Sequence, residues 1–174
     1  DNGIWTVVVD PAAKIGETEY ASLQEAFNVG GEITLLRDIT IAETVVLAEG
    51  KTVVLDLNGK TLAAVDKNTI KNNGGNLTLK NGTVTRTGDA VGYSVNNASG
   101  EINVVDATIE RGLYTSGSKM TATNANISHE QSSRHAIYAW DCEVTINSGI
   151  FHNDNAGNAT LMASGSSVVT INGG

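Results

Sequence analysis

Cysteine, proline, aromatic residues and positive charge are all scarce in this sequence. Cys142 is the only cysteine, which excludes an internal disulfide framework and a metal site of the CxxC type. Eleven scattered Lys and Arg residues face 19 acidic residues, and the net charge is −8. A nucleic-acid-binding surface needs clustered basic residues, so we expect no nucleic-acid partner. No apolar run approaches the roughly 18 residues of a membrane span, so we expect no membrane insertion.

Asparagine and glycine are abundant instead. The 174 residues include 18 Asn and 19 Gly, with 40% hydrophobic and only 5% aromatic residues. A chain of this length suits one domain, and its core must consist of Val, Ile, Leu and Ala rather than large rings.

A short pattern recurs along the chain. The pattern spans eight positions. Positions one, three and eight are apolar, positions four and five are small or polar, position six is usually Gly or Ala, and positions two and seven accept any residue. The copies begin, 18 to 25 residues apart, at Ile33 (degenerate), Leu55, Leu77, Ile102, Met120, Val144 and Val169. Each copy alternates with a period of two, as strands do, and none has helical spacing.

Repeats of this length that cannot bury their own apolar face stack into a β-solenoid. The variable spacing excludes a hexapeptide helix, and the GGxGxD motif of calcium-binding arrays is missing. We therefore predict an all-β fold, a right-handed single-stranded parallel β-helix of about seven coils. Asn81, Asp106 and Asn124 follow the second apolar position by two residues, and we expect the chain to bend there in a left-handed conformation.

The first residues do not repeat. Residues 4–9 and 13–15 are typical of short strands, and Ser22 with Glu25 forms a capping-box motif that predicts a helix over 22–29, ended by Gly30 and Gly31. We interpret residues 1–31 as an N-terminal cap and 32–174 as the β-helix. No C-terminal cap is present, so we expect the natural protein to continue beyond Gly174.

These motifs resemble the pectate-lyase-like β-helix superfamily. The segment 20–27, followed by 31–36, is similar to the capping helix and first coil of those proteins. The phrase 169–174 resembles the coil ends of modular bacterial surface proteins and of phage spikes and fibres. The motifs that polygalacturonases of the superfamily use for catalysis are missing: no adjacent Asp-Asp pair occurs anywhere. The resemblance thus implies a fold rather than a chemistry.

One polar cluster offers a catalytic alternative. If the repeat register holds, the positions just past the final apolar residue of each coil place Arg111, His129, Glu130 and Asp154 within about two coil spacings, roughly 10 Å. Such a set could supply paired carboxylates or a histidine for acid–base chemistry. The alternative interpretation is a solvated bend with casually paired charges.

An aromatic column offers a binding site. Leu113, Ile137 and Leu161 are expected to point inward, which turns Tyr114, Tyr138 and Met162 outward on successive coils, with Trp140 beside them. Exposed rings on a rigid sheet provide flat surfaces for sugar rings. Packing under a loop or against another subunit is the alternative.

We therefore expect a non-catalytic extracellular module from a bacterial surface protein, such as an adhesin, or from a phage appendage. Its partner would be a carbohydrate or another ligand on a host or cell surface, bound by Tyr114, Tyr138 and Trp140, with no cofactor and no metal. A homo-oligomer is possible. The acidic net charge favours an uncharged ligand. A polysaccharide lyase or glycoside hydrolase, and a structural spacer, are the alternatives.

Overall fold

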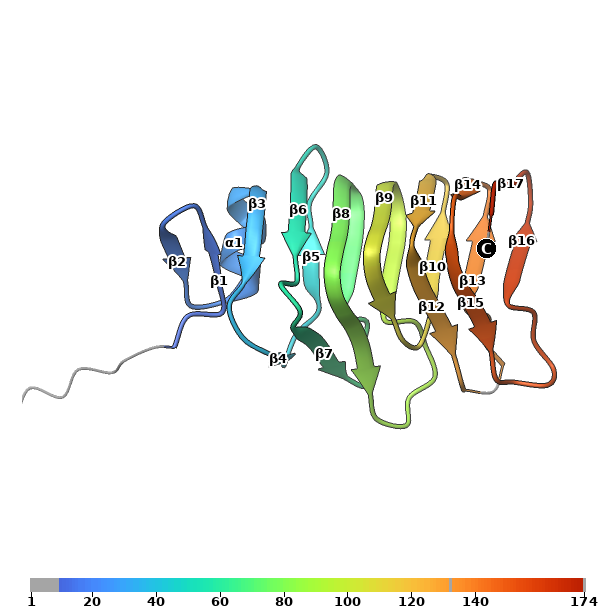
Figure 1. Cartoon of the computed structure of the whole chain (residues 1–174), viewed down its shortest axis with the longest axis horizontal. Helices are drawn as coiled ribbons and strands as arrows, with labels where there is room; N and C mark the ends of the chain where they lie inside the picture. The colour runs from blue at the N-terminus through green and yellow to red at the C-terminus, as the bar shows by residue number, and fades with distance from the viewer. Residues whose placement is uncertain (1–9, 132, 174) are drawn as a thin grey trace, which may run out of the picture.

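A small cap precedes the repeats. The computed structural model describes residues 10–131 and 133–173, so the strand expected over 4–9 lies outside the described residues. The antiparallel pair β1 (Ala13–Ile15) and β2 (Thr18–Tyr20) leads into α1 (Leu23–Val29). Ser22 accepts a hydrogen bond from the backbone N–H of Glu25, whose carboxylate accepts one from the N–H of Ser22. The predicted capping box therefore starts the helix, and the cap closes one end of a rod (Figure 1).

The rest of the chain winds through three parallel sheets, here called the first, second and third faces. The first face contains the middle parts of β8 (Ile70–Thr87) and β9 (Val95–Ile109) together with β3 (Gly31–Leu35), β6 (Thr52–Asp56), β11 (Lys119–Thr123), β14 (Glu143–Ile146) and β17 (Val168–Ile171). The second face contains the ends of β8 and β9 with β4 (Ile39–Ile41), β7 (Thr61–Val65), β12 (Ala125–His129) and β15 (Gly149–Asn153). The third face contains the starts of β8 and β9 with β5 (Val45–Leu47), β10 (Leu113–Ser116), β13 (Ile137–Trp140) and β16 (Leu161–Ser164).

The molecule is an all-β parallel solenoid, as predicted, with 58% strand and 4% helix. It makes about six turns, close to the predicted number of about seven coils. The seventh copy of the repeat, at Val169, supplies only β17 of a further turn. The right-handed sense of the coil stays a prediction from the general preference of parallel crossovers.

Left-handed residues make the bend between the first and second faces. Asn81, Asp106 and Asn124 have φ values of 60°, 50° and 48°, as the sequence predicts, and Asn58 (φ 51°) serves the coil before them. Asn and Asp tolerate this region because their short polar side chains bond locally. Because the bend recurs at the equivalent position of each coil, the strands that follow it stay in register from coil to coil.

The register differs from the predicted one in the first two coils. Leu77 aligns with Ile102, Met120, Val144 and Val169, as expected. Ile33 and Leu55, however, align with Leu79 and not with Leu77. The sequence Val53-Val54-Leu55-Asp56-Leu57 offers apolar residues at three alternating positions, and a slip of two residues keeps the same side chains facing inward. The pattern alone therefore cannot distinguish the two registers.

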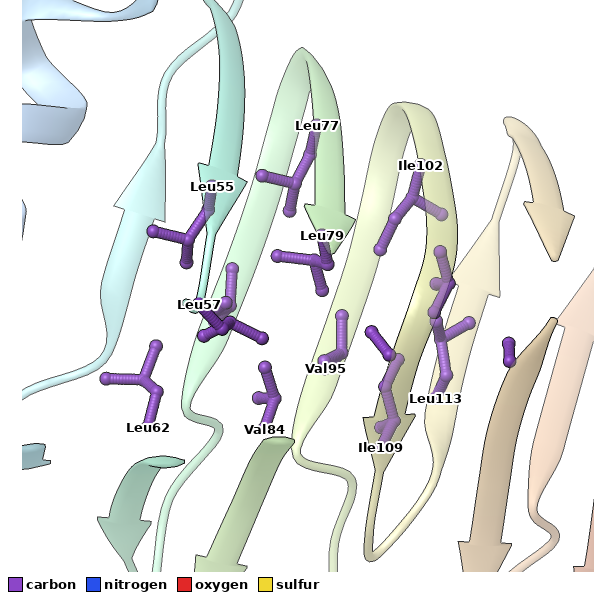
Figure 2. Close-up of a cluster of buried hydrophobic side chains, with 14 of the residues drawn as sticks. Leu55, Leu57, Leu62, Leu77, Leu79, Val84, Val95, Ile102, Ile109 and Leu113 are labelled. Carbon is purple, nitrogen blue, oxygen red and sulfur yellow. The ribbon is translucent and has the colours of Figure 1, made fainter. Parts of the chain in front are cut away.

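A narrow aliphatic core fills the rod. Side chains from all three faces point into the shared interior and stack between coils (Figure 2). The stack includes Leu55, Leu62, Leu79, Ile109 and Leu113, each fully buried. Burial of such a side chain is worth roughly 1.5–3 kcal/mol, so the stacked interior accounts for the stability of a chain with few rings.

A polar ladder runs through one corner of this interior, where the third face meets the first. Asn72 donates to the side-chain oxygen of Asn97 at 2.8 Å. Asn97 in turn donates to the hydroxyls of Thr115 (3.0 Å) and Ser118 (2.8 Å). These hydrogen bonds satisfy amides that would otherwise be buried at a cost.

Candidate functional site

The predicted aromatic column exists on the third face. Leu113, Ile137 and Leu161 are in register and point inward, and the adjacent register row is Tyr114, Tyr138 and Met162. Trp140 ends β13 and is 44% exposed. The period-two alternation placed these side chains correctly because the three strands form regular parallel pairs.

The rings contact one another along the column. The ring centroids of Tyr114 and Tyr138 are 5.5 Å apart at an interplanar angle of 67°, and those of Tyr138 and Trp140 are 6.5 Å apart at 89°. Such edge-to-face pairs are favourable because the positive ring edge meets the negative ring face. Tyr93 extends the series, with its ring 6.0 Å from that of Tyr114. Sequence analysis missed Tyr93 because it lies in a connection outside the repeat.

A groove of about 690 Å³ adjoins these rings. Tyr93, Tyr114, Tyr138 and Met162 line it, together with residues of the connection 88–94 on one side and Ser133, Arg134 and His135 on the other. Between these two connections, the single turn 110–112 joins β9 to β10. A short turn between two longer connections leaves a recess, and Tyr114, the second residue of β10, lines it.

Arg86 lies under the connection 88–94. Its side chain donates from Nη2 to the carbonyl oxygen of Ala90 (3.0 Å) and from Nη1 to that of Tyr93 (3.5 Å). A Cβ added at Gly92 would lie 2.0 Å from Nη1, so a larger residue there would force the guanidinium to move. Asp66 accepts a hydrogen bond from the N–H of Ala90 at 2.8 Å and thereby holds the same connection from the previous coil.

Three of the four residues of the catalytic alternative lie at a second hollow of about 460 Å³, on the second face. Arg111 pairs with Glu130 there, with Nε 3.0 Å from Oε1. His152, which the prediction did not include, lies 3.9 Å from the carboxylate of Asp154. Arg111, Glu130 and Asp154 thus share one hollow, as the repeat register predicts.

His129 does not join them, which corrects the expected cluster. It is 1% exposed, because the last position of β12 points inward. Its Nδ1 accepts the N–H of Gln131 at 3.1 Å, so Nε2 carries the proton and donates to the carbonyl oxygen of Gly92 at 3.1 Å. Burial lowers the pKa of His129 below its usual range, and the charges of Arg111 and Arg134 lower it further. A neutral, enclosed ring with both nitrogens bonded is a structural support for the groove.

Cys142 is not placed for thiolate chemistry, and the described acidic residues form no metal-binding group. The thiol is buried, its Sγ lies 3.8 Å from the carbonyl oxygen of Thr115, and burial raises its pKa, which disfavours the reactive thiolate. Within residues 10–131 and 133–173, no group of three or more His, Cys, Asp or Glu side chains is placed to hold a metal ion.

Comparison of the chain with protein-family models, curated proteins and solved structures finds no match. Among the described residues, no helix has both the length and the apolar character that crossing a bilayer requires. The geometry of the groove and of the second hollow is therefore the basis for the functional proposal.

Proposed function

We propose that this chain is a non-catalytic module of an extracellular protein that binds carbohydrate on its third face. The observation that carries the proposal is the unbroken column of Tyr114, Tyr138 and Trp140 beside a groove large enough for a sugar unit. Aromatic rings bind the apolar faces of sugars, and the polar atoms around a groove orient the hydroxyl groups.

Two further features support this proposal. The site stands on β10 and β13, each of which is hydrogen-bonded to a parallel strand on both sides, so its rings are held before a ligand arrives. Preorganisation of this kind lowers the entropic cost of binding. The sequence resemblance to the pectate-lyase-like superfamily, and to bacterial surface proteins and phage spikes, also fits a carbohydrate partner outside the cell, though it is an analogy of fold.

The direct test is affinity electrophoresis in gels that contain xylan, dextran, alginate or hyaluronan. We expect at least one polymer to retard the protein and Tyr138→Ala or Trp140→Ala to abolish the retardation. Ile150→Ala is the matched control, because it removes another exposed apolar side chain, on the neighbouring second face. Unchanged retardation of both aromatic variants would place the binding elsewhere and refute the proposal.

A polysaccharide lyase or hydrolase is the second candidate, favoured by the hollow that gathers Glu110, Glu130 and Asp154 around Arg111. Two carboxylates flanking a scissile bond are the usual arrangement in glycoside hydrolysis. Size-exclusion chromatography of the same polymers after incubation separates the candidates. Shortened chains that disappear with Glu130→Gln or Asp154→Asn would establish the enzyme, whereas intact polymers support the binding module.

A further inference from the structure

We propose that the groove recognises a sugar that carries a carboxylate, with Arg86 and Arg134 as the residues that bind the acidic group. This inference rests on the proposed carbohydrate-binding function and names the chemical class of its ligand. The inference addresses the charged group of the ligand, whereas the aromatic column would contact the apolar faces of its sugar rings.

Arg86 is a buried cation without a carboxylate partner. Arg86 is only 4% exposed, yet it lines the groove on one side and the second hollow on the other. Its Nε has no hydrogen-bond partner, and no carboxylate of the described residues lies within 4.0 Å of the guanidinium. Among the described residues, its acceptors are the two backbone carbonyls of Ala90 and Tyr93. Burying a charge is costly unless the charge is paired, so such a side chain is poised for an anion.

The surrounding charges leave this cation uncompensated. Burial lowers the pKa of Arg86, the charge of Arg111 lowers it further, and Arg134 acts in the same direction. Asp66 opposes them, but its Oδ1 already accepts the backbone N–H of Ala90. An arginine nevertheless stays protonated at physiological pH, so the positive charge remains in the groove.

Arg134 approaches the groove from the opposite connection. Its guanidinium carbon lies 6.0 Å from the ring centroid of Tyr93, and its Nη1 donates to the carbonyl oxygen of Ser133 at 2.8 Å. No ion pair joins Arg134 to a carboxylate in the part of the chain that the structure describes. The two arginines therefore face the same cavity, one from each side.

The lining of the groove has the opposite charge sign to the whole chain. Lys67, Arg86 and Arg134 line it against a single carboxylate, Asp66, while the chain carries −8. Lys67 contributes less than the arginines because its Nζ is 3.1 Å from Glu43. A guanidinium matches a carboxylate with two parallel hydrogen bonds, and the adjacent Tyr114 and Tyr138 suit the uncharged ring of the sugar. The local geometry thus favours an acidic ligand, whereas the net charge favours a neutral one.

The test compares alginate and hyaluronan with their carboxyl-reduced forms, which keep the same backbone without the charge. We expect the acidic form of one polymer to bind at least about tenfold more tightly at low salt, and the difference to shrink as salt is added. Arg134→Gln and Arg86→Gln should weaken binding of the acidic form about tenfold and leave the reduced form unchanged. Arg37→Gln removes the same charge at a site that pairs with Asp10, away from the groove, and should change nothing.

The outcomes separate the two proposals. Equal affinity for acidic and reduced polymers, still lost in Tyr138→Ala, overturns the carboxylate inference and leaves the carbohydrate site standing. Failure of both forms to bind the folded protein overturns the carboxylate inference, and it overturns the carbohydrate site as well if xylan and dextran also fail to retard the protein. Circular dichroism checks that Arg86→Gln folds. If this variant does not fold, Arg134→Gln and Arg86→Lys test the inference instead. Lysine keeps the positive charge but lacks the paired donors of arginine. Unchanged affinity in these variants overturns the inference.

Discussion

Tyr114 and Tyr138 occupy equivalent positions on adjacent coils, and their rings meet at 5.5 Å in an edge-to-face pair. The backbone pairing of β10 with β13 brings the two rings together, so the contact does not depend on the tyrosine hydroxyl groups. The rings therefore form one continuous surface with Trp140 on the next outward position of β13. This surface, rather than any single residue, is the basis of the proposed carbohydrate site.

Replacing Tyr138 by Phe and by Leu separates ring stacking from apolar contact. We expect Tyr138→Phe to keep most of the affinity for a retained polysaccharide and Tyr138→Leu to lose about tenfold, because only an aromatic face matches a sugar ring. Urea unfolding should show changes of about 1 kcal/mol or less, since the side chain lies outside the core. Equal affinity of the Phe and Leu variants would show that ring stacking does not contribute.

Leu79 tests the stacked aliphatic core. It is fully buried between Leu55 and Val104 on the first face, so Leu79→Ala should lower the free energy of unfolding by roughly 2–5 kcal/mol through lost burial and the cavity that remains. Thr78→Ala, one position away and facing outward, is the control and should cost less than about 1 kcal/mol. Urea denaturation monitored by circular dichroism measures both. A small effect at Leu79 would contradict the inward stacking in Figure 2.

His129 makes stability depend on pH. Its pKa is lowered in the folded protein from 6.5, mainly by burial, so the unfolded chain takes up the proton first as the pH falls. The stabilisation is complete above pH 6.5 and is lost progressively as the pH falls from there toward the lower folded pKa. Urea denaturation at several pH values between about 7.5 and 5.5 should therefore show a decline that His129→Gln reduces.

His152 provides the control for this pH dependence, because its side chain is 47% exposed. His152→Gln should keep the decline seen in the unmodified protein. If His129→Gln shows the same slope as the unmodified protein, the histidine is not held neutral in the fold.

Asn81 tests the left-handed bend. With φ at 60°, Asn81→Ala should cost about 1–2 kcal/mol, because a Cβ is unfavourable in this region and the amide's hydrogen bonds to Asp56 are lost. Asn81→Gly removes the same hydrogen bonds and relieves the backbone, so it should cost less. Thermal unfolding of the two variants compares them. Equal losses would assign the cost to the side-chain hydrogen bonds alone.

Much of the fold could be predicted from the sequence because its signals are local. The alternation around Leu113, Ile137 and Leu161 correctly oriented the column of Tyr114 and Tyr138. Ser22 and Glu25 correctly marked the start of α1. The register of the first two coils could not be predicted, because alternating apolar residues from Val53 to Leu57 allow a slip of two.

The sequence by itself determined the solenoid, its facing residues and its bends, because period-two alternation and left-handed Asn or Asp act within a few residues. Only the tertiary structure decided that His129 and Arg86 are buried, and that Tyr93 and Arg134 meet around the groove. These contacts arise where connections of unequal length from successive coils fold over one another. Their paths depend on contacts with neighbouring coils, such as the hydrogen bond from Ala90 to Asp66, which a local pattern in the chain does not reveal.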